Sequence, residues 1–242
     1  MSEFVGGLEE RLRAVATPER AASEKRYLKS DLSFLGATVW QIRAAVRDLS
    51  RGLSLDHLAL VALVEELWSA PVHERRMAAV ILLDRFSELL TADDLPLLER
   101  LVRGSRTWAL VDGLATDVLG ALVQADPDVI AQHLDRWAVD EDFWIRRASL
   151  LAELRAIRRG DALDRFLSRA DAMLEEREFF IRKAIGWVLR EAGKRRPEEV
   201  VAWMAPRTHR SSGVTMREAV KYLPPNDGAR LMAAYREHRP AA

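Results

Sequence analysis

The feature that most constrains this chain is an internal repeat. The segment FWIRRA at residues 143–148 returns 36 residues later as FFIRKA at residues 179–184. Weaker echoes, RRMA at 75–78 and MREA at 216–219, lie about one or two periods away. A period of this length is typical of helix pairs that stack side by side and bury their apolar faces against neighbouring pairs. The chain is therefore expected to be an array of such pairs.

The hydrophobic pattern supports helices throughout. Apolar residues recur at three- and four-residue steps, as in Leu58, Val61, Val64 and Leu67, and strict alternation is nearly absent. Prolines fall between the periodic segments, at positions 18, 71, 127, 197 and 225, where they mark helix boundaries. The sequence predicts an all-α fold of HEAT-like helical repeats, stacked into a curved α-solenoid with a concave face, as one domain over residues 1–242.

The charge balance is neutral overall but uneven along the chain. The sequence has 37 Lys and Arg against 37 Asp and Glu, yet residues 141–242 carry 21 basic and 15 acidic side chains. A local basic excess is compatible with a face that binds a polyanion, and it also occurs on solvated helices laced with salt bridges.

Composition excludes several classes of site. The sequence of 242 residues has no cysteine, which rules out disulfides, thiolate nucleophiles and cysteine-ligated metals. Its five histidines lack the i,i+4 spacing of a helical metal site, and it has no glycine-rich phosphate loop or nucleophile elbow. We expect no cofactor and no metal. No apolar run approaches the roughly 18 residues of a membrane helix and no signal pattern is seen, so we expect a cytoplasmic protein with no membrane partner.

Aromatic and polar residues pair at helical spacing on three predicted helices. The pairs are Trp108 with Asp112, Trp144 with Arg147, and Trp187 with Arg190. An indole beside a guanidinium offers a flat apolar wall and a phosphate clamp. The structural alternative is a packed tryptophan whose neighbouring arginine extends to solvent.

Asp112 stands out within the repeat. With the 36-residue period it falls at the position of Ala148 and Ala184, so that a carboxylate would replace a small apolar side chain. An ionised group in such a place is costly unless it is paired. Asp112 is therefore either a salt-bridged structural residue or a functional one.

Four segments together resemble the AlkD-type alkylpurine DNA glycosylases, which are built from HEAT-like repeats. They are YLK (27–29) with FLG (34–36), TWALVD (107–112), FWIRRA (143–148) and EFFIRKAIGWVLRE (178–191). The resemblance covers nearly the whole chain, and the last segment is the most specific because generic helix packing does not require so long a run of particular residues.

The resemblance implies roles for individual residues. Asp112 would be the catalytic carboxylate, Trp108 and Trp187 would flank the sugar of the damaged nucleotide, and Arg147 and Arg190 would contact the DNA backbone. The adjacent Arg146 could exchange roles with Arg147. The expected DNA-binding set also includes Tyr27, Lys29, Trp144, Arg146 and Lys183.

The implied chemistry needs few residues. A purine alkylated at N3 or N7 is a cation and leaves as a neutral base without a general acid. A carboxylate near C1′ stabilises the oxocarbenium-like sugar and can orient an attacking water. The resemblance also implies excision without insertion of the base into a deep pocket, which would leave room for bulky adducts.

Two functions follow as expectations. One is a monomeric, nucleoid-associated, monofunctional DNA glycosylase for cationic N3- or N7-alkylpurines in duplex DNA. The other is a noncatalytic HEAT-repeat scaffold that binds DNA or protein.

Overall fold

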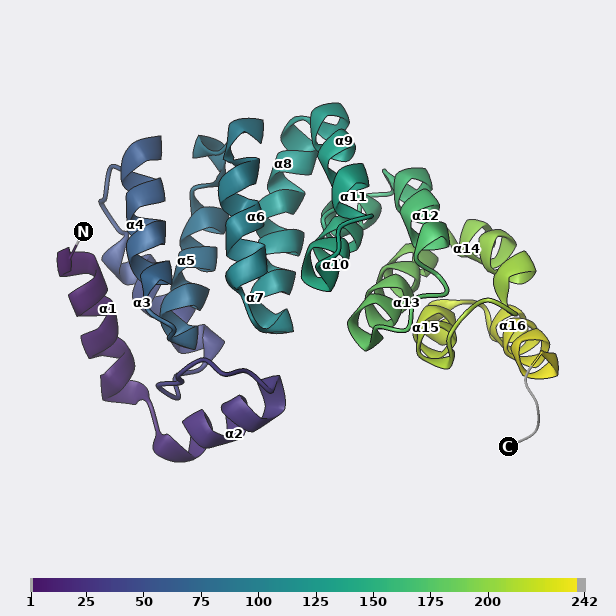
Figure 1. Ribbon diagram of the computed structural model, residues 1–242, viewed down its shortest axis with the longest axis horizontal. Coiled ribbons are helices and arrows are strands. Elements are labelled where there is room, and N and C mark those ends of the chain that lie inside the picture. The colour runs from purple at the N-terminus through teal and green to yellow at the C-terminus, as the bar shows by residue number, and fades with distance from the viewer. Residues whose placement is uncertain (1, 239–242) are drawn as a thin grey trace. The chain divides into compact units, whose positions relative to one another are not determined.

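The computed structural model describes residues 2–238, and these residues confirm the predicted all-α fold of helical repeats. The chain divides into two compact units, Met1–Leu122 and Val123–Ala242, which are described separately below. Figure 1 shows helices next to one another within each unit, such as α4 beside α5 and α13 beside α15.

The first unit is built from eight consecutive helical elements and a connecting pair of 3-10 turns among its described residues. They are α1 (Ser2–Val15), α2 (Pro18–Leu28), α3 (Val39–Leu49), α4 (His57–Ser69), α5 (His73–Arg85), η1 (Ser87–Leu89), η2 (Ala92–Asp94), α6 (Leu95–Gly104), α7 (Trp108–Gly113) and the π-helical segment η3 (Leu114–Leu119). The helix α8 (Gly120–Ala125) begins in this unit and ends in the next.

The second unit continues the pairing of helices. Its elements are α9 (Pro127–Trp137), α10 (Phe143–Leu151), α11 (Leu154–Ile157), α12 (Leu163–Ala172), α13 (Phe179–Gly193), α14 (Pro197–Met204), η4 (Ala205–Arg207), α15 (Gly213–Ala219), η5 (Val220–Tyr222) and α16 (Pro225–Glu237). Helix α13 packs against α10, α14 and α15.

The helix boundaries follow the sequence pattern. Pro18, Pro127, Pro197 and Pro225 each stand at the first position of a helix, where the missing N–H costs nothing, and Pro71 lies in the turn between α4 and α5. Threonine and aspartate side chains cap the first turns of α2, α3, α4, α7, α9 and α10. The predicted boundaries at these prolines are confirmed.

The repeat is regular at the level of helix starts. Helices α5, α7, α10 and α13 begin at residues 73, 108, 143 and 179, so successive starts lie 35, 35 and 36 residues apart. The third residues of the last three helices, Leu110, Ile145 and Ile181, are all fully buried. Equivalent positions therefore pack in equivalent ways.

This register corrects the expected place of Asp112. The sixth residues of α7, α10 and α13 are the small Gly113, Ala148 and Ala184, and a Cβ on Gly113 would lie only 2.9 Å from Val80 Cγ1. Asp112 is the fifth residue of its helix, so it does not replace an alanine. Its counterparts are the cations Arg147 and Lys183. The 36-residue period misplaced it by one because the step from α7 to α10 is 35.

The segment Trp108–Ala125 is one run of helix in which α7, η3 and α8 follow without a break. Contrary to the sequence-based expectation, it is long and apolar enough by length and composition to cross a membrane, and half of this window is buried inside the protein. Its α7 and η3 parts pack on α5, and η3 also packs on α6. This packing is typical of a core helix.

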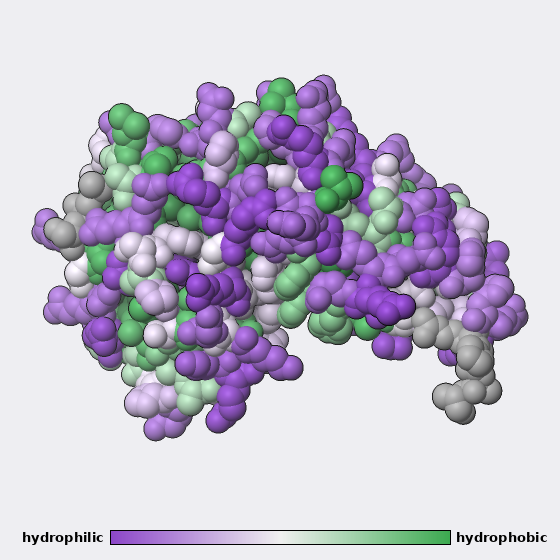
Figure 2. All heavy atoms as spheres, in the orientation of Figure 1, coloured by the Kyte–Doolittle hydropathy of each residue, from purple (hydrophilic) through white to green (hydrophobic). Residues whose placement is uncertain are grey.

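The surface is largely hydrophilic where Figure 2 shows it, with isolated hydrophobic residues among charged ones. The curvature of the predicted solenoid, its concave face and its single-domain character stay predictions.

Candidate functional site

In the first unit, Trp108 and Tyr27 come together from distant parts of the chain. Thr107 caps α7 by accepting a hydrogen bond from the Ala109 N–H (3.4 Å), which sets Trp108 at the first helical position. The Trp108 indole meets the ring of Tyr27 edge to face, with centroids 5.7 Å apart and an angle of 84° between planes. Tyr27 lies in the last turn of α2 and is 70% exposed. The two rings form an accessible aromatic corner.

Asp112 lies one helical turn beyond Trp108 and on the same side of α7. It is partly exposed, between the buried Val111 and the close-packed Gly113. The π-helical segment η3 begins two residues later. Segments of π-helix are frequent at functional sites because they change the direction of side chains within a helix. The sequence pattern did not predict this segment.

The loops beside this corner are joined by an ion pair. Arg106, which precedes α7 with a positive φ of 55°, donates from Nη1 to Asp31 Oδ2 at 2.6 Å. Lys29 ends α2 in the left-handed conformation (φ 49°) and is exposed. The Arg106–Asp31 pair ties the end of α2 to the start of α7. Both side chains are largely solvent-exposed, so its contribution to stability is small.

Sequence reasoning missed a buried carboxylate that fixes the loop between α2 and α3. Glu74, at the start of α5, is fully buried and accepts hydrogen bonds from the N–H groups of Leu35 (3.0 Å), Gly36 (2.7 Å) and Ala37 (3.3 Å). Gly36 has φ +99°, and a Cβ there would lie 2.1 Å from the Thr17 carbonyl oxygen, so the loop requires glycine. The sequence signal available was the glycine of the FLG segment.

His73 supports the same loop. Its ring stacks on Phe34 with centroids 4.9 Å apart. Burial lowers the pKa of His73 to about 4, against the smaller opposing effect of the Glu74 carboxylate. His73 is therefore a neutral packing residue at neutral pH.

In the second unit, one face of α13 carries an indole between cations. Lys183, Trp187, Arg190 and Lys194 follow one another at spacings of four, three and four residues, which places them on a single stripe. All four are partly or fully exposed. We call these residues the α13 stripe.

A buried carboxylate on α15 holds the stripe in place. Glu218 is 6% exposed and accepts hydrogen bonds from Lys183 Nζ (2.6 Å), Lys221 Nζ (2.8 Å) and Arg190 Nη1. Burial alone raises the pKa of Glu218, but the hydrogen bonds from Lys183 and Lys221 outweigh it and lower the pKa to about 2. Gly186 permits this close approach of α13 and α15, because a Cβ there would lie 2.7 Å from Glu218 Cβ.

The ion pairs leave a positive surplus on this surface. Glu191 accepts from Lys194 Nζ (2.8 Å) and Arg158 Nε (3.1 Å), and it lies 3.7 Å from Arg190 Nε. Glu191 and Glu218 are thus two carboxylates paired with five cations, which leaves a formal surplus of +3. Such a surplus around an indole is suited to a polyanion.

The two adjacent arginines of α10 both have partners inside the protein. Arg147 is 3% exposed, donates to the Phe180 carbonyl oxygen (2.5 Å) and lies over the Phe180 ring. Arg146 is partly exposed and donates to both carboxylate oxygens of Glu176 (2.8 and 2.9 Å) and to the Asp140 carbonyl. Arg146 is the more accessible of the two. A DNA contact by either arginine stays a prediction.

Trp144 joins an aromatic cluster rather than an isolated pair with Arg147. Its ring lies 4.4 Å from that of Phe143 and 4.8 Å from that of Phe180, and Phe179 extends the cluster to the surface. The cluster joins the first turns of α10 and α13, where the repeated FWIRRA and FFIRKA segments begin.

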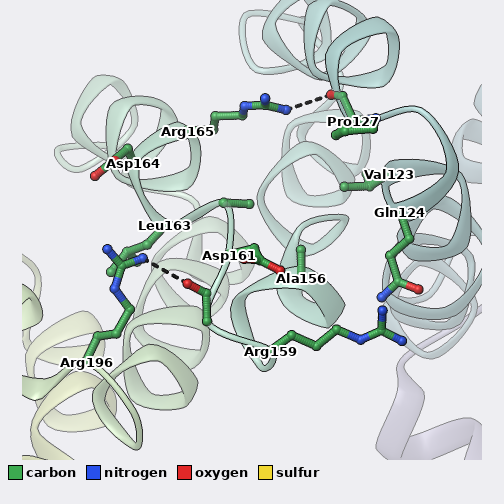
Figure 3. Close-up of a pocket in the computed structure, with 12 residues that line it drawn as sticks. Val123, Gln124, Pro127, Ala156, Arg159, Asp161, Leu163, Asp164, Arg165 and Arg196 are labelled. Atoms are coloured by element: carbon green, nitrogen blue, oxygen red, sulfur yellow. Dashed lines mark hydrogen bonds between the residues drawn. The ribbon is translucent and has the colours of Figure 1, made fainter.

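The second unit also has a cavity of about 500 Å³ between the ends of neighbouring pairs. Figure 3 shows Gln124 and Arg159 on one side of it, with Arg165 bonded to the Pro127 carbonyl (2.7 Å) and Arg196 bonded to the Gly160 carbonyl (3.3 Å). None of the site residues expected from the sequence lines this cavity. Within residues 2–238, no group of three or more His, Asp or Glu side chains is placed to hold a metal ion.

Comparison with solved structures gives the same fold. A predicted DNA alkylation repair enzyme from Enterococcus faecalis matches with a TM-score of 0.77 and 24% identity, covering 87% of this chain and 97% of that one. AlkD2 from Streptococcus mutans matches with a TM-score of 0.62 and 18% identity, covering 84% and 99%. The smu.31 protein of Streptococcus mutans UA159 gives 0.61 and 17%, covering 85% and 98%.

Sequence comparison assigns the family. Curated proteins give no match. The family model described as DNA alkylation repair enzyme matches residues 8–223, which is most of the chain. This range contains the aromatic corner with Asp112 and the α13 stripe with Glu218, in agreement with the resemblance seen in the sequence. The chain therefore belongs to the DNA alkylation repair enzyme family.

Proposed function

We propose that this protein is a monofunctional DNA glycosylase that hydrolyses the N-glycosidic bond of purines alkylated at N3 or N7 in duplex DNA. Asp112 is the proposed catalytic carboxylate, and Trp108 and Trp187 are the proposed contacts to the sugar of the damaged nucleotide. The positive surplus around the α13 stripe supports binding to a polyanionic substrate. We further propose that the protein acts as a monomer in the cytoplasm, associated with the nucleoid.

The observation that carries the proposal is the placement of Asp112. Asp112 is a partly exposed residue one turn from Trp108, whose indole meets the exposed Tyr27. The same position of the repeat holds a cation in α10 and α13. A single carboxylate at a position that is cationic in α10 and α13, beside an aromatic corner, is suited to a ligand that is anionic along its backbone and develops positive charge at one sugar.

The reaction would use charge rather than acid catalysis. The alkylated base is already cationic, so the C1′–N bond breaks with the bonding electrons passing to the base, which leaves neutral. Positive charge then develops at C1′ and O4′ of the deoxyribose. The Asp112 carboxylate stabilises this charge, and one of its oxygens orients the water that adds to C1′ and accepts its proton as the abasic sugar forms. The Trp108 indole, one turn from Asp112, excludes bulk water on its side of the carboxylate, which strengthens the electrostatic interaction.

The decisive experiment compares two carboxylates of one helical run. Asp112→Asn should lower the single-turnover release of 7-methylguanine and 3-methyladenine from methylated duplex by two to three orders of magnitude, or about 3 to 4 kcal/mol of activation free energy. Asp117→Asn is the matched control, because Asp117 lies in η3, five residues further along the same helical run, and accepts a hydrogen bond from the Thr116 hydroxyl. Trp187→Ala should also release little base while remaining folded.

Equal rates for the wild-type, Asp112→Asn and Trp187→Ala proteins would exclude this mechanism. Absence of release by the wild-type protein, with retained duplex binding, would favour the noncatalytic scaffold. The same assay with bulky N3 and N7 adducts in place of methyl groups defines the range of lesions.

A further inference from the structure

Helix α3 repeats the spacing of the α13 stripe on an unpartnered face. The segment VWQIRAAVR at 39–47 matches GWVLREAGK at 186–194, with tryptophan, arginine and a second cation at relative positions 0, +3 and +7. The match is not a result of the helix repeat, because Trp40 is the second residue of α3 and Trp187 is the ninth of α13. We call Trp40, Arg43 and Arg47 the α3 stripe.

The α3 stripe points away from the core. Ile42, Ala45 and Val46 are buried on the opposite side of α3, which packs on α1 and α5. Trp40 is 82% exposed, and Arg43 and Arg47 are exposed as well. An indole left in water forgoes the stabilisation of burial, and structural packing does not account for one in this position.

The charges of the α3 stripe are also little compensated. Arg47 and the neighbouring Arg51 share the single carboxylate of Asp48 at 3.3 and 3.1 Å. Arg43 makes no hydrogen bond or ion pair with any residue in the described part of the chain. Three arginines with one aspartate leave a formal surplus of +2. On α13, by contrast, the buried carboxylates of Glu218 and Glu191 hold the cations.

We propose that the α3 stripe binds the sugar–phosphate backbone of duplex DNA outside the lesion, an inference that rests on the proposed function for its substrate. Arg43 and Arg47 donate to phosphate oxygens, and Trp40 packs its ring on a deoxyribose. From Trp40 to Arg47 the helix rises about 10 Å, close to the rise of three base pairs. Three arginines that have only the carboxylate of Asp48 between them favour a polyanion over a protein surface.

The test measures binding to undamaged duplex DNA as a function of salt. Arg43→Ala with Arg47→Ala should weaken binding about tenfold at low salt and reduce the slope of log K against log salt by about 2, as expected for two lost phosphate contacts. Arg100→Ala with Arg103→Ala on α6 removes the same charge from exposed, glutamate-paired arginines and should leave the slope unchanged.

Trp40 is tested separately. Trp40→Ala should weaken duplex binding about fivefold without changing the salt slope, because the lost contact is not ionic. Leu58→Ala is the matched control, since Leu58 is a similarly exposed apolar residue (77%). Thermal denaturation should be nearly unchanged in all these variants, because every altered side chain is exposed.

The outcomes separate this inference from the proposed function. If the wild-type protein excises methylated purines but the α3 variants bind duplex with wild-type affinity and slope, the α3 stripe is not a DNA contact and the inference is wrong. If the wild-type protein excises nothing but the α3 variants lose affinity and slope, the α3 stripe is supported while the glycosylase proposal fails. A loss of the same size in the α6 control overturns the inference, because general charge then explains binding.

Discussion

The fifth residue of the second helix in a repeat differs in charge between the two units. In α7 it is Asp112, partly exposed beside Trp108 and the exposed Tyr27. In α13 it is Lys183, which bonds to the buried Glu218 together with Arg190 and Lys221. The same scaffold position therefore presents a carboxylate in one unit and a cation in the other. Repeat proteins can change one such position without disturbing the packing, because the buried third residues and the small sixth residues maintain the fold.

The largest effect is expected when the fifth position of α7 is given the positive charge that the same position has in α13. Asp112→Lys should reduce excision by at least the two to three orders of magnitude of Asp112→Asn, because a cation repels the charge that develops on the sugar. Binding of undamaged duplex should tighten or stay unchanged, since the substitution raises the net charge by two. Single-turnover excision and salt-dependent binding measure the two effects.

Asp117→Lys provides the control for this prediction. It adds the same charge from the η3 segment of the same helical run and should leave excision near wild type. If Asp112→Lys and Asp117→Lys change excision equally, the position of the charge does not matter, and the difference between Asp112 and Lys183 has no role in catalysis.

The sequence was informative about the fold because the helical pattern is local. Proline boundaries and three-to-four periodicity predicted helices, and the repeated FWIRRA and FFIRKA segments predicted equivalent helices. The alignment of Asp112 with Ala148 was wrong, since a single period ignores a change of one residue in loop length between repeats. The helix starts at Trp108 and Phe143 reveal that change, and the small residue required at Gly113 beside Val80 agrees with it.

The candidate site was less predictable because its support is long-range. Nothing near Gly36 in the sequence indicates that Glu74 would accept three N–H groups from residues 35–37, and nothing near Trp187 indicates that Glu218 would hold the cations around it. The exposure of Trp40 and the burial of Arg147 likewise depend on which side of a helix meets its neighbours. The catalytic and DNA-binding assignments stay predictions.

An intermediate effect is expected from removing the anchor of the α13 stripe. Glu218→Gln should lower excision about tenfold, because Lys183 and Arg190 lose the acceptor that positions them around Trp187. It should also lower the free energy of unfolding by about 1 to 3 kcal/mol, the usual cost of weakening charged hydrogen bonds to a buried acceptor. Denaturant unfolding and single-turnover excision are the measurements.

Glu199→Gln is the matched control for Glu218→Gln. It makes the same change of charge in an exposed pair with Arg196, so it should leave both quantities near wild type. Both variants lose one negative charge, so their net charge rises by one, and charge alone would tighten duplex binding in each. A Glu218→Gln protein that matches Glu199→Gln in excision would show that Glu218 does not position the stripe.

The smallest expected effect is a difference between the two units in the pH range over which each loses stability. The pKa of His73 falls from 6.5 to about 4 on folding, so the unfolded chain binds the proton more tightly. The stabilising contribution of His73 is complete above pH 6.5 and is lost as the pH falls towards 4. For Glu218, whose pKa falls from 4.5 to about 2, the loss occurs between pH 4.5 and 2. As the pH falls, the first unit should therefore lose the stabilising contribution of His73 before the second unit loses that of Glu218.

His73→Phe isolates the first of these effects while keeping an aromatic ring against Phe34. Between pH 6.5 and 4 the free energy of unfolding of the variant should depend less on pH than that of the wild type, by up to about 1.4 kcal/mol per pH unit. The difference between variant and wild type cancels the opposing contribution of Glu153, whose pKa burial raises to about 7. Denaturant unfolding at several pH values measures it. Parallel curves of unfolding free energy against pH for the two proteins would mean that His73 binds its proton as readily in the folded state as in the unfolded chain. The first unit would then lose no stability through His73 at a higher pH than the second unit loses it through Glu218.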